Sequence, residues 1–175
     1  MTDSHEKFLR ECEAEIEAQS QNAKLIRLSR DWFIAANAAK YSYHFRWLDR
    51  PIIQYPQDIV AFQEIVWRVR PDLIIETGIA HGGSLILSAS LLAMLDLCDA
   101  TASGHMLDPA EPKRKVIGVD IDIRAHNRSA IEAHPMSNRI TLIQGSSIDP
   151  TVVEQVKAAA ASAKTVLVCL DSNHT

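Results

Sequence analysis

The spacing of apolar residues along the chain predicts a domain of alternating strands and helices. Short, almost wholly apolar runs are typical of strands that are covered on both faces. The expected strands are residues 72–76, 116–119, 140–144 and 165–170. Because segments with helical spacing alternate with these runs, the sequence predicts an α/β fold with a Rossmann-like, doubly wound parallel sheet.

The helices between these strands have recognisable ends. Pro56 suits the first position of a helix, and Arg70-Pro71 ends the same segment. Residues 84–97 are apolar almost all round, which predicts a helix buried against the sheet. Asp149 or Ser147 is expected to cap a further helix that runs to Lys164, and residues 99–113 are expected to form an exposed loop.

The first 55 residues have a different character. Residues 3–20 and 24–39 have helical spacing, and an aromatic stretch between Tyr41 and Tyr55 then alternates with Lys and Arg. Such a stretch can stack on nucleic-acid bases, but an acidic chain favours packing as a lid or core. We expect an N-terminal helical or lid segment over residues 1–55 and the α/β domain over residues 56–175.

Composition narrows the class of protein. At 47% hydrophobic residues the chain can bury a core, and its net charge of −4 argues against a nucleic-acid binder and favours a small-molecule partner. Three isolated cysteines predict neither disulfides nor zinc, and they suit a cytoplasmic protein. No signal peptide is visible, and the apolar run 85–95 is too short to span a membrane.

The end of the sequence raises an expectation about completeness. The chain stops five residues after the fourth expected strand, whereas an inner parallel strand needs a neighbour on each side. We expect the N-terminal part of a longer protein, or a truncated product whose open strand edge favours a homo-oligomer. A complete small fold is the alternative.

Polar residues follow each expected strand: Glu76, Asp120, Ser146 with Ser147, and Asp171. Ligands of open α/β sheets bind beyond the carboxyl ends of the strands, so these groups are expected to converge on one site. Acting as helix caps is the alternative reading for any one of them.

The loop after the first expected strand limits which class of cofactor the chain can bind. Its glycines stand as Gly78-x-x-x-Gly82-Gly83, which departs from the GxGxxG of dinucleotide sites and disfavours a nicotinamide-dependent oxidoreductase. Glu76 precedes the loop and would repel a diphosphate while favouring a cationic ligand.

This arrangement resembles motif I of class I S-adenosylmethionine (SAM)-dependent methyltransferases. Residues 116–122 resemble the second motif of that class, and residues 144–147 occupy the place of its adenine-side motif. Together with residues 74–84, 119–124 and 170–175, the likeness is to the family of rhamnosyl O-methyltransferases and so-called cephalosporin hydroxylases, over about residues 40–175.

The resemblance implies roles for individual residues. Gly78, Gly82 and Ser84 would line the methionine part of SAM, with Glu76 near its amino end and His81 facing the cofactor. The remaining cofactor-binding residues would be Asp120 and Asp122 for the ribose side, and Ser146 and Ser147 for adenine.

The resemblance also implies a reaction. Members are described as binding a divalent cation through an acid at the fourth strand end, which here is Asp171, so Mg²⁺ is expected together with downstream acids. Asp171 and His174 are the candidate catalytic residues. The leading hypothesis is an O-methyltransferase acting on a hydroxyl of a sugar or small natural product, with a place in lipid or polysaccharide biosynthesis. A catalytically silent fragment that binds cofactor or a partner is the alternative.

Overall fold

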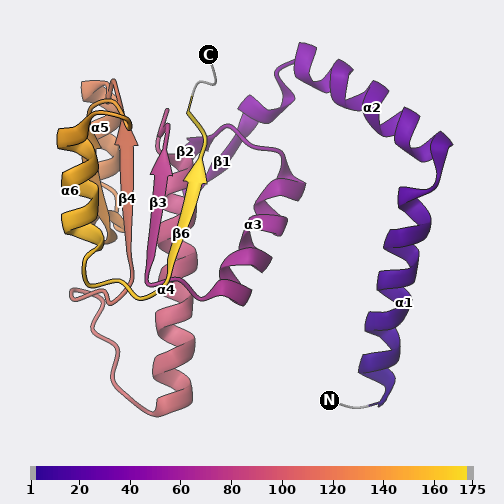
Figure 1. Ribbon diagram of the computed structural model, residues 1–175, viewed down its shortest axis with the longest axis horizontal. Coiled ribbons are helices and arrows are strands. Elements are labelled where there is room, and N and C mark those ends of the chain that lie inside the picture. The colour runs from indigo at the N-terminus through magenta and orange to yellow at the C-terminus, as the bar shows by residue number, and fades with distance from the viewer. Residues whose placement is uncertain (1–2, 173–175) are drawn as a thin grey trace. The chain divides into compact units, whose positions relative to one another are not determined.

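The computed structural model describes residues 3–172, and the chain divides into two compact units between Tyr41 and Ser42 (Figure 1). The first unit contains helices α1 (Asp3–Ser20) and α2 (Ala23–Ala38). Asn22 is the N-cap of α2, and its side chain accepts a hydrogen bond from the Leu25 backbone N–H at 3.0 Å. Near the end of this unit, the rings of Trp32 and Tyr41 meet edge to face.

The second unit is built on the predicted sheet. Its four strands are β3 (Leu73–Thr77), β4 (Lys115–Asp120), β5 (Ile140–Gln144) and β6 (Val166–Leu170), in the order β5-β4-β3-β6. All three pairings are parallel, so every carboxyl end lies at the same edge of the sheet (Figure 1). The predicted fold class is confirmed, with strand ends shifted by a residue at most places.

Helices cover both faces of this sheet. Helices α3 (Pro56–Val69) and α4 (Gly83–Ser103) pack with Ile74 and Val116 on one face, and α6 (Pro150–Ala160) packs with Leu73 and Ile117 on the other. Helix α5 (Ala125–Glu132) follows β4. By length and composition alone α4 could cross a membrane, but it runs along the sheet with most of its residues from Gly83 to Asp96 buried, so its apolarity is that of a core helix.

Helix α4 is longer than predicted. Residues 99–103 were expected in a loop but continue the helix to Ser103, and Gly104 ends it in the left-handed region with φ +68°. The extension has a reason in tertiary structure, because Asp99 accepts hydrogen bonds from Arg70 at the end of α3 and from Arg114 just before β4. Local polarity does not reveal these contacts.

A short hairpin precedes α3 and belongs to the second unit. Strands β1 (Phe45–Trp47) and β2 (Arg50–Ile52) are antiparallel, and the turn residues Leu48 and Asp49 both have positive φ. Trp47 donates from Nε1 to Ser90 Oγ of α4 at 2.9 Å. Because the hairpin packs on α4, it belongs to the second unit. That unit begins at Ser42, whereas the sequence predicted a boundary at residue 55.

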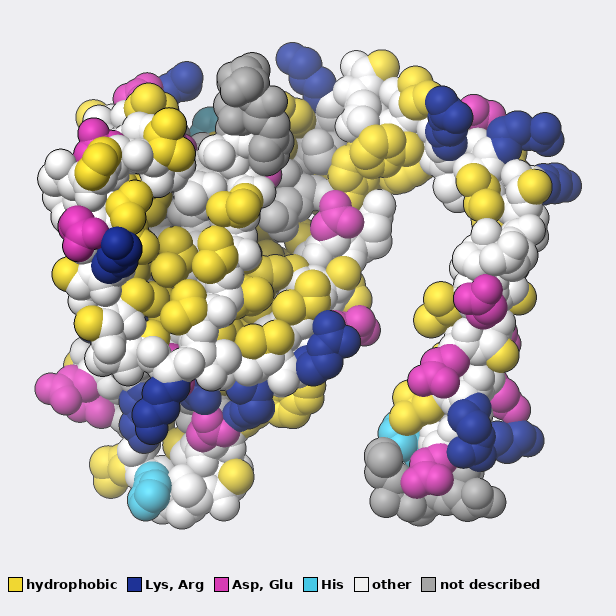
Figure 2. All heavy atoms as spheres, in the orientation of Figure 1, with side chains coloured by type: hydrophobic (Ala, Val, Ile, Leu, Met, Phe, Trp, Pro, Cys, Tyr) yellow, Lys and Arg dark blue, Asp and Glu magenta, His cyan; other side chains and the backbone are white. Residues whose placement is uncertain are grey.

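One part of the sheet carries apolar side chains on the surface. Side chains alternate along a strand, and on β6 the residues Val166, Val168 and Leu170 point to the α6 side, where they are 40%, 53% and 70% exposed. Figure 2 shows apolar side chains gathered over this face of the sheet. Helix α6 therefore covers β4 and β5 better than it covers β6.

Candidate functional site

A pocket of about 530 Å³ lies at the carboxyl edge of the sheet, and we call it the strand-end pocket. It is formed by the ends of all four strands, the glycine loop and the residues after the hairpin. Its lining comprises Pro51, Ile53, Gln54, Thr77, Gly78, Ile79, Ala80, His81, Gly83, Ser84, Val119, Asp120, Ile121, Gly145, Ser146, Ser147, Asp171 and Ser172. The volume is in the range of sites for cofactors and other small molecules.

The glycines in the loop are required by close approach of the backbone. Gly78 has φ +84°, and a Cβ there would lie 2.3 Å from the backbone oxygen of Asp171. At Gly83, the first residue of α4, a Cβ would lie 2.2 Å from the Pro51 oxygen. The loop thus fits tightly between β6 and the hairpin, which leaves the start of α4 facing the pocket.

The outer side of the loop is held by two side chains that lie far away in the sequence. Ala80 has φ +41°, an unfavourable conformation for a residue with a Cβ, and its carbonyl accepts from Asn127 Nδ2 at 3.0 Å. The carbonyl of His81 accepts from Arg50, whose Nε lies at 3.1 Å. Asn127 is 5% exposed. We call Arg50 and Asn127 the loop clamp, because they hold both peptide groups although neither lines the pocket.

Asp120 connects two segments of the site. One carboxylate oxygen accepts from the Ile79 backbone N–H at 2.8 Å, and the other accepts from the Asp122 N–H at 3.1 Å. The half-buried carboxylate therefore joins the glycine loop to the loop after β4 while lining the pocket. A carboxylate held in this way is preorganised to accept hydrogen bonds from a ligand.

Glu76 faces a second pocket of about 490 Å³, which we call the side pocket. The side pocket lies between α3, α4 and β6 and shares Ile53, Gln54, Ser84 and Asp171 with the strand-end pocket. Glu76 is 3% exposed and accepts a hydrogen bond from Ser84 Oγ. Burial, partly offset by that hydrogen bond and assisted by the charge of Asp171, raises the pKa of Glu76 from 4.5 to about 8. Glu76 is thus mostly protonated at neutral pH.

The family of the chain is decided by its match over the site and the sheet. The family described as rhamnosyl O-methyltransferase/CmcI matches residues 39–175, which is most of the chain and includes every strand. This chain belongs to the rhamnosyl O-methyltransferase/CmcI family. No curated protein sequence matches it significantly.

Solved structures agree with this family at the level of the fold. A CmcI structure named as Mg-SAM aligns with 76% of this chain at 22% sequence identity and a TM-score of 0.51. An apo structure of CmcI aligns over the same share at 23% identity and a TM-score of 0.49. The alignments cover 48% and 47% of those chains, so this chain spans about half the length of the solved structures that it matches.

The structure brings most of the predicted site residues of this family member together. The strand-end pocket is lined by Gly78, His81, Ser84, Asp120, Ser146, Ser147 and Asp171. Glu76 lines the adjoining side pocket instead, because its position on β3 points it to the α4 face. Gly82 lies behind the loop against Ile131, and Asp122 is exposed outside both pockets. His174 lies outside the described residues.

Sequence reasoning missed two polar residues of the site. Gln54 and Thr77 line the strand-end pocket, and within residues 3–172 neither Gln54 Oε1 nor Thr77 Oγ1 has a hydrogen-bond partner, although both atoms are buried. Buried polar atoms without partners are uncommon and indicate a place for a ligand or water. Gln54 follows the hairpin, and no motif in the sequence indicated that this segment reaches the site.

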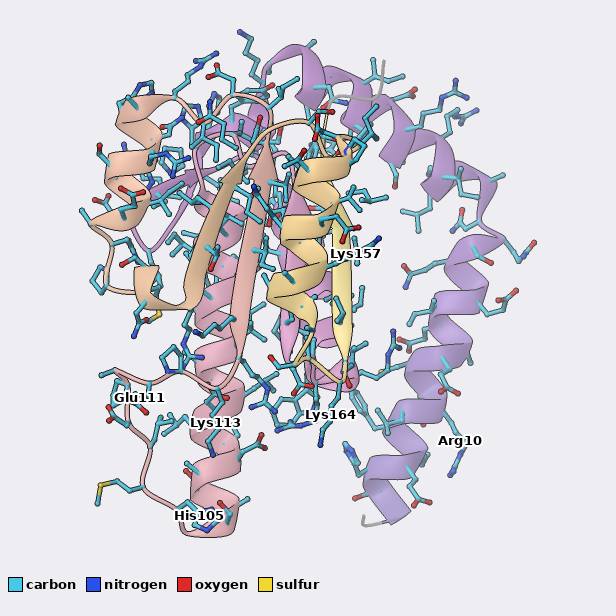
Figure 3. All side chains as sticks on the ribbon, turned by 60° about the vertical axis from the view of Figure 1, so that its left-hand side comes forward. Arg10, His105, Glu111, Lys113, Lys157 and Lys164 are labelled. Carbon is cyan, nitrogen blue, oxygen red and sulfur yellow. The ribbon has the colours of Figure 1, made fainter. Side chains whose placement is uncertain are left out.

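The charges around the pockets distinguish the two ends of the sheet. No Lys or Arg lines either pocket among the described residues. Figure 3 shows Lys113 and Lys164 at the opposite end, where strands begin. Burial, followed by the charges of Glu76 and Asp171, raises the pKa of Cys169 to about 11, so this side-pocket residue stays a thiol and is a poor nucleophile.

Metal binding through Asp171 stays a prediction. Within residues 3–172 no group of three or more His, Cys, Asp or Glu side chains lies close enough to hold a metal ion. Because Mg²⁺ needs several oxygen ligands in octahedral geometry, the described residues do not by themselves fit that ion.

Proposed function

We propose that this chain binds SAM in the strand-end pocket and transfers its methyl group to a hydroxyl of a sugar or small natural product. Membership of the rhamnosyl O-methyltransferase/CmcI family supports the reaction class. The observation that carries the proposal is the convergence of the glycine loop, Asp120 and Ser147 on one pocket that also holds partnerless buried polar atoms.

The residues present suit the parts of SAM. Asp120 accepts hydrogen bonds from the ribose hydroxyls, and Ser146 and Ser147 lie beside adenine. The first N–H groups of α4, where Gly82 supplies no side-chain cap, receive the methionine carboxylate. The carboxylates of Asp120 and Asp171 favour the positively charged sulfonium, and among residues 3–172 no Lys or Arg lines the pocket to oppose it.

Methyl transfer then depends mainly on alignment. The sulfonium supplies an activated methyl group, so the protein's part is to direct a substrate oxygen at that carbon. Asp171 lines both pockets and is placed to accept a hydrogen bond from the acceptor hydroxyl. As the oxygen–carbon bond forms and the carbon–sulfur bond breaks, the hydroxyl proton passes to the Asp171 carboxylate and then to water.

Calorimetric titration of the full chain with SAM, S-adenosylhomocysteine and NAD tests this proposal. We expect both sulfur nucleosides to bind and NAD to fail. Asp120→Asn should weaken SAM binding about tenfold or more, because a charge-assisted hydrogen bond contributes about 1.5–3 kcal/mol. Asp122→Asn is the matched control, since this neighbouring acid lies outside both pockets. Binding of NAD alone, or equal losses in the two variants, would contradict the proposal.

A further inference from the structure

The side pocket has the features of a binding site but is not part of the strand-end pocket. Its walls are mainly apolar and come from α3 with the preceding residue, from α4 and from β6. The apolar side chains are those of Tyr55, Ala61, Phe62, Ile65, Leu87 and Cys169. It reaches the strand-end pocket at Ser84 and Asp171, which line both. A molecule in the side pocket therefore lies next to a molecule in the strand-end pocket.

Unused hydrogen-bonding groups inside the side pocket indicate a ligand with hydroxyl groups. Ser88 of α4 is 1% exposed, and its Oγ has no partner among residues 3–172. Gln54 Oε1, also buried without a described partner, lines the same pocket. Because a buried polar atom without a partner lowers stability, a hydroxyl that reaches Ser88 or Gln54 gains affinity in an otherwise apolar space.

The charges exclude one large class of ligands. The lining includes the acids Asp58, Glu76 and Asp171, and no Lys, Arg or His lines it within the described part of the chain. An anionic group would lose its hydration there without meeting a cation, and it would lie near the acids Asp58 and Asp171, whereas Glu76 is mostly neutral. A neutral molecule has neither cost.

We propose that the side pocket binds the methyl acceptor, and that the acceptor is a neutral hydroxylated compound with an apolar ring or chain, in place of an acidic or phosphorylated one. This inference rests on the proposed function and adds to it the substrate class. The apolar walls hold the body of the acceptor, Ser88 and Gln54 bind its polar substituents, and the reacting hydroxyl points past Ser84 and Asp171 toward the strand-end pocket.

Calorimetry with a matched pair of probes tests whether the side pocket prefers a neutral acceptor. The probes are 2-naphthol and 6-hydroxy-2-naphthoate, each titrated into the full chain with S-adenosylhomocysteine present. We expect 2-naphthol to bind at least tenfold more tightly than the carboxylate. Equal binding of the two, or tighter binding of the carboxylate, overturns the inference.

Substitutions on α3 test the location. Ala61 lines the side pocket at an exposed helix position, so Ala61→Trp should fill the space without unfolding the protein. Val60 is its neighbour and is 58% exposed outside both pockets, which makes Val60→Trp the control. We expect Ala61→Trp to abolish 2-naphthol binding and leave SAM binding unchanged, whereas Val60→Trp changes neither.

The buried serine gives a second, milder test. The probe here is 2,6-dihydroxynaphthalene, whose second hydroxyl can bind Ser88 while the first points toward Asp171. Ser88→Ala removes the partnerless hydroxyl and should weaken binding of this diol several-fold without lowering the melting temperature. The inference fails, and the proposed function stands, if SAM binds but 2-naphthol does not. It also fails if Ala61→Trp leaves 2-naphthol binding unchanged and Ser88→Ala leaves diol binding unchanged. If SAM itself does not bind, the proposed function fails.

Discussion

At the scale of single residues, the direction of a side chain decided its role. The alternation along β3 turns Glu76 to the α4 face and into the side pocket, where it meets Ser84, and its expected place near the amino end of the cofactor stays a prediction. Asp120 and Asp122 stand two residues apart, yet only the first lines the strand-end pocket. Glu76 is buried, and within residues 3–172 no Lys or Arg lines its pocket, so the fold favours the neutral form of its side chain.

The raised pKa of Glu76 predicts how stability changes with pH. Its pKa is about 8 in the folded protein against 4.5 as a free side chain, so between these values the unfolded state releases its proton first. The stabilising contribution is complete below pH 4.5 and is lost as the pH rises to about 8. Glu76→Gln does not titrate, so at pH 8.5 it should be more stable than the wild type, by up to about 5 kcal/mol.

Urea unfolding at pH 5 and pH 8.5 measures this difference. Glu64→Gln, at an exposed position of α3, is the control and should follow the wild type at both pH values. An unchanged pH dependence in Glu76→Gln would show that Glu76 is ionised in the folded protein.

At the scale of elements, the site depends on contacts between segments that are distant in sequence. The glycine loop is formed by β3 and α4, but its shape is fixed by Arg50 of β2 and Asn127 of α5. The far end of α4 is fixed in a similar way by the arginines that precede β4 and β5.

The loop clamp predicts a loss of cofactor affinity from a residue outside the pocket. Asn127→Ala leaves the Ala80 carbonyl without its partner and releases a residue held at φ +41°. We expect SAM binding to weaken about tenfold and the free energy of unfolding to fall by about 1–3 kcal/mol. Calorimetry and urea unfolding measure the two effects.

Arg128→Ala, on the same helix and paired with an exposed Glu132, is the matched control for Asn127→Ala. It should leave both quantities nearly unchanged. If Asn127→Ala lowers stability but not SAM affinity, the clamp supports the fold and does not position the loop.

Asp96, Arg114 and Arg139 form a buried ion network. Breaking this network is expected to lower stability strongly and to have no other effect. Asp96 has a fully buried side chain and accepts hydrogen bonds from Arg114 and Arg139, each at 2.6 Å. Asp96→Ala leaves two largely buried arginines without this carboxylate and should cost about 3–5 kcal/mol in urea unfolding. Glu154→Ala breaks an exposed pair with Lys157 and should cost under about 1 kcal/mol. Equal costs would contradict a structural role for the buried network.

At the scale of the whole molecule, the hydrophobic core belongs to the second unit. Every member of the two buried clusters lies between Ile52 and Val152, and among the described residues of the first unit only Ala36 is buried. The sheet, the hairpin and the described lining of both pockets therefore all lie in the second unit.

Deletion variants test this division. We expect residues 42–175 to unfold cooperatively with a melting temperature close to that of the full chain. Residues 56–175, cut at the boundary expected from sequence, lose Trp47, Arg50 and the buried Ile52, and should not fold stably. Circular dichroism during heating measures both. Equal stability of the two shorter chains would contradict the role of the hairpin.

The sequence by itself determined the strands, their parallel arrangement, the glycine loop and most of the polar residues at the strand ends. These features follow from local rules: apolar runs make buried strands, Pro and Gly mark element ends, and parallel strands bring their carboxyl ends to one edge. The extension of α4 to Ser103 was missed because Arg70 and Arg114 support it from other elements.

Only the tertiary structure decided which distant groups complete the site. Gln54 enters it because the hairpin packs on α4, Asn127 holds the loop because α5 lies behind it, and Glu76 leaves the strand-end pocket because of its register on β3. Each outcome depends on how elements pack and on one residue of strand register, and the periodicity of a single segment contains neither.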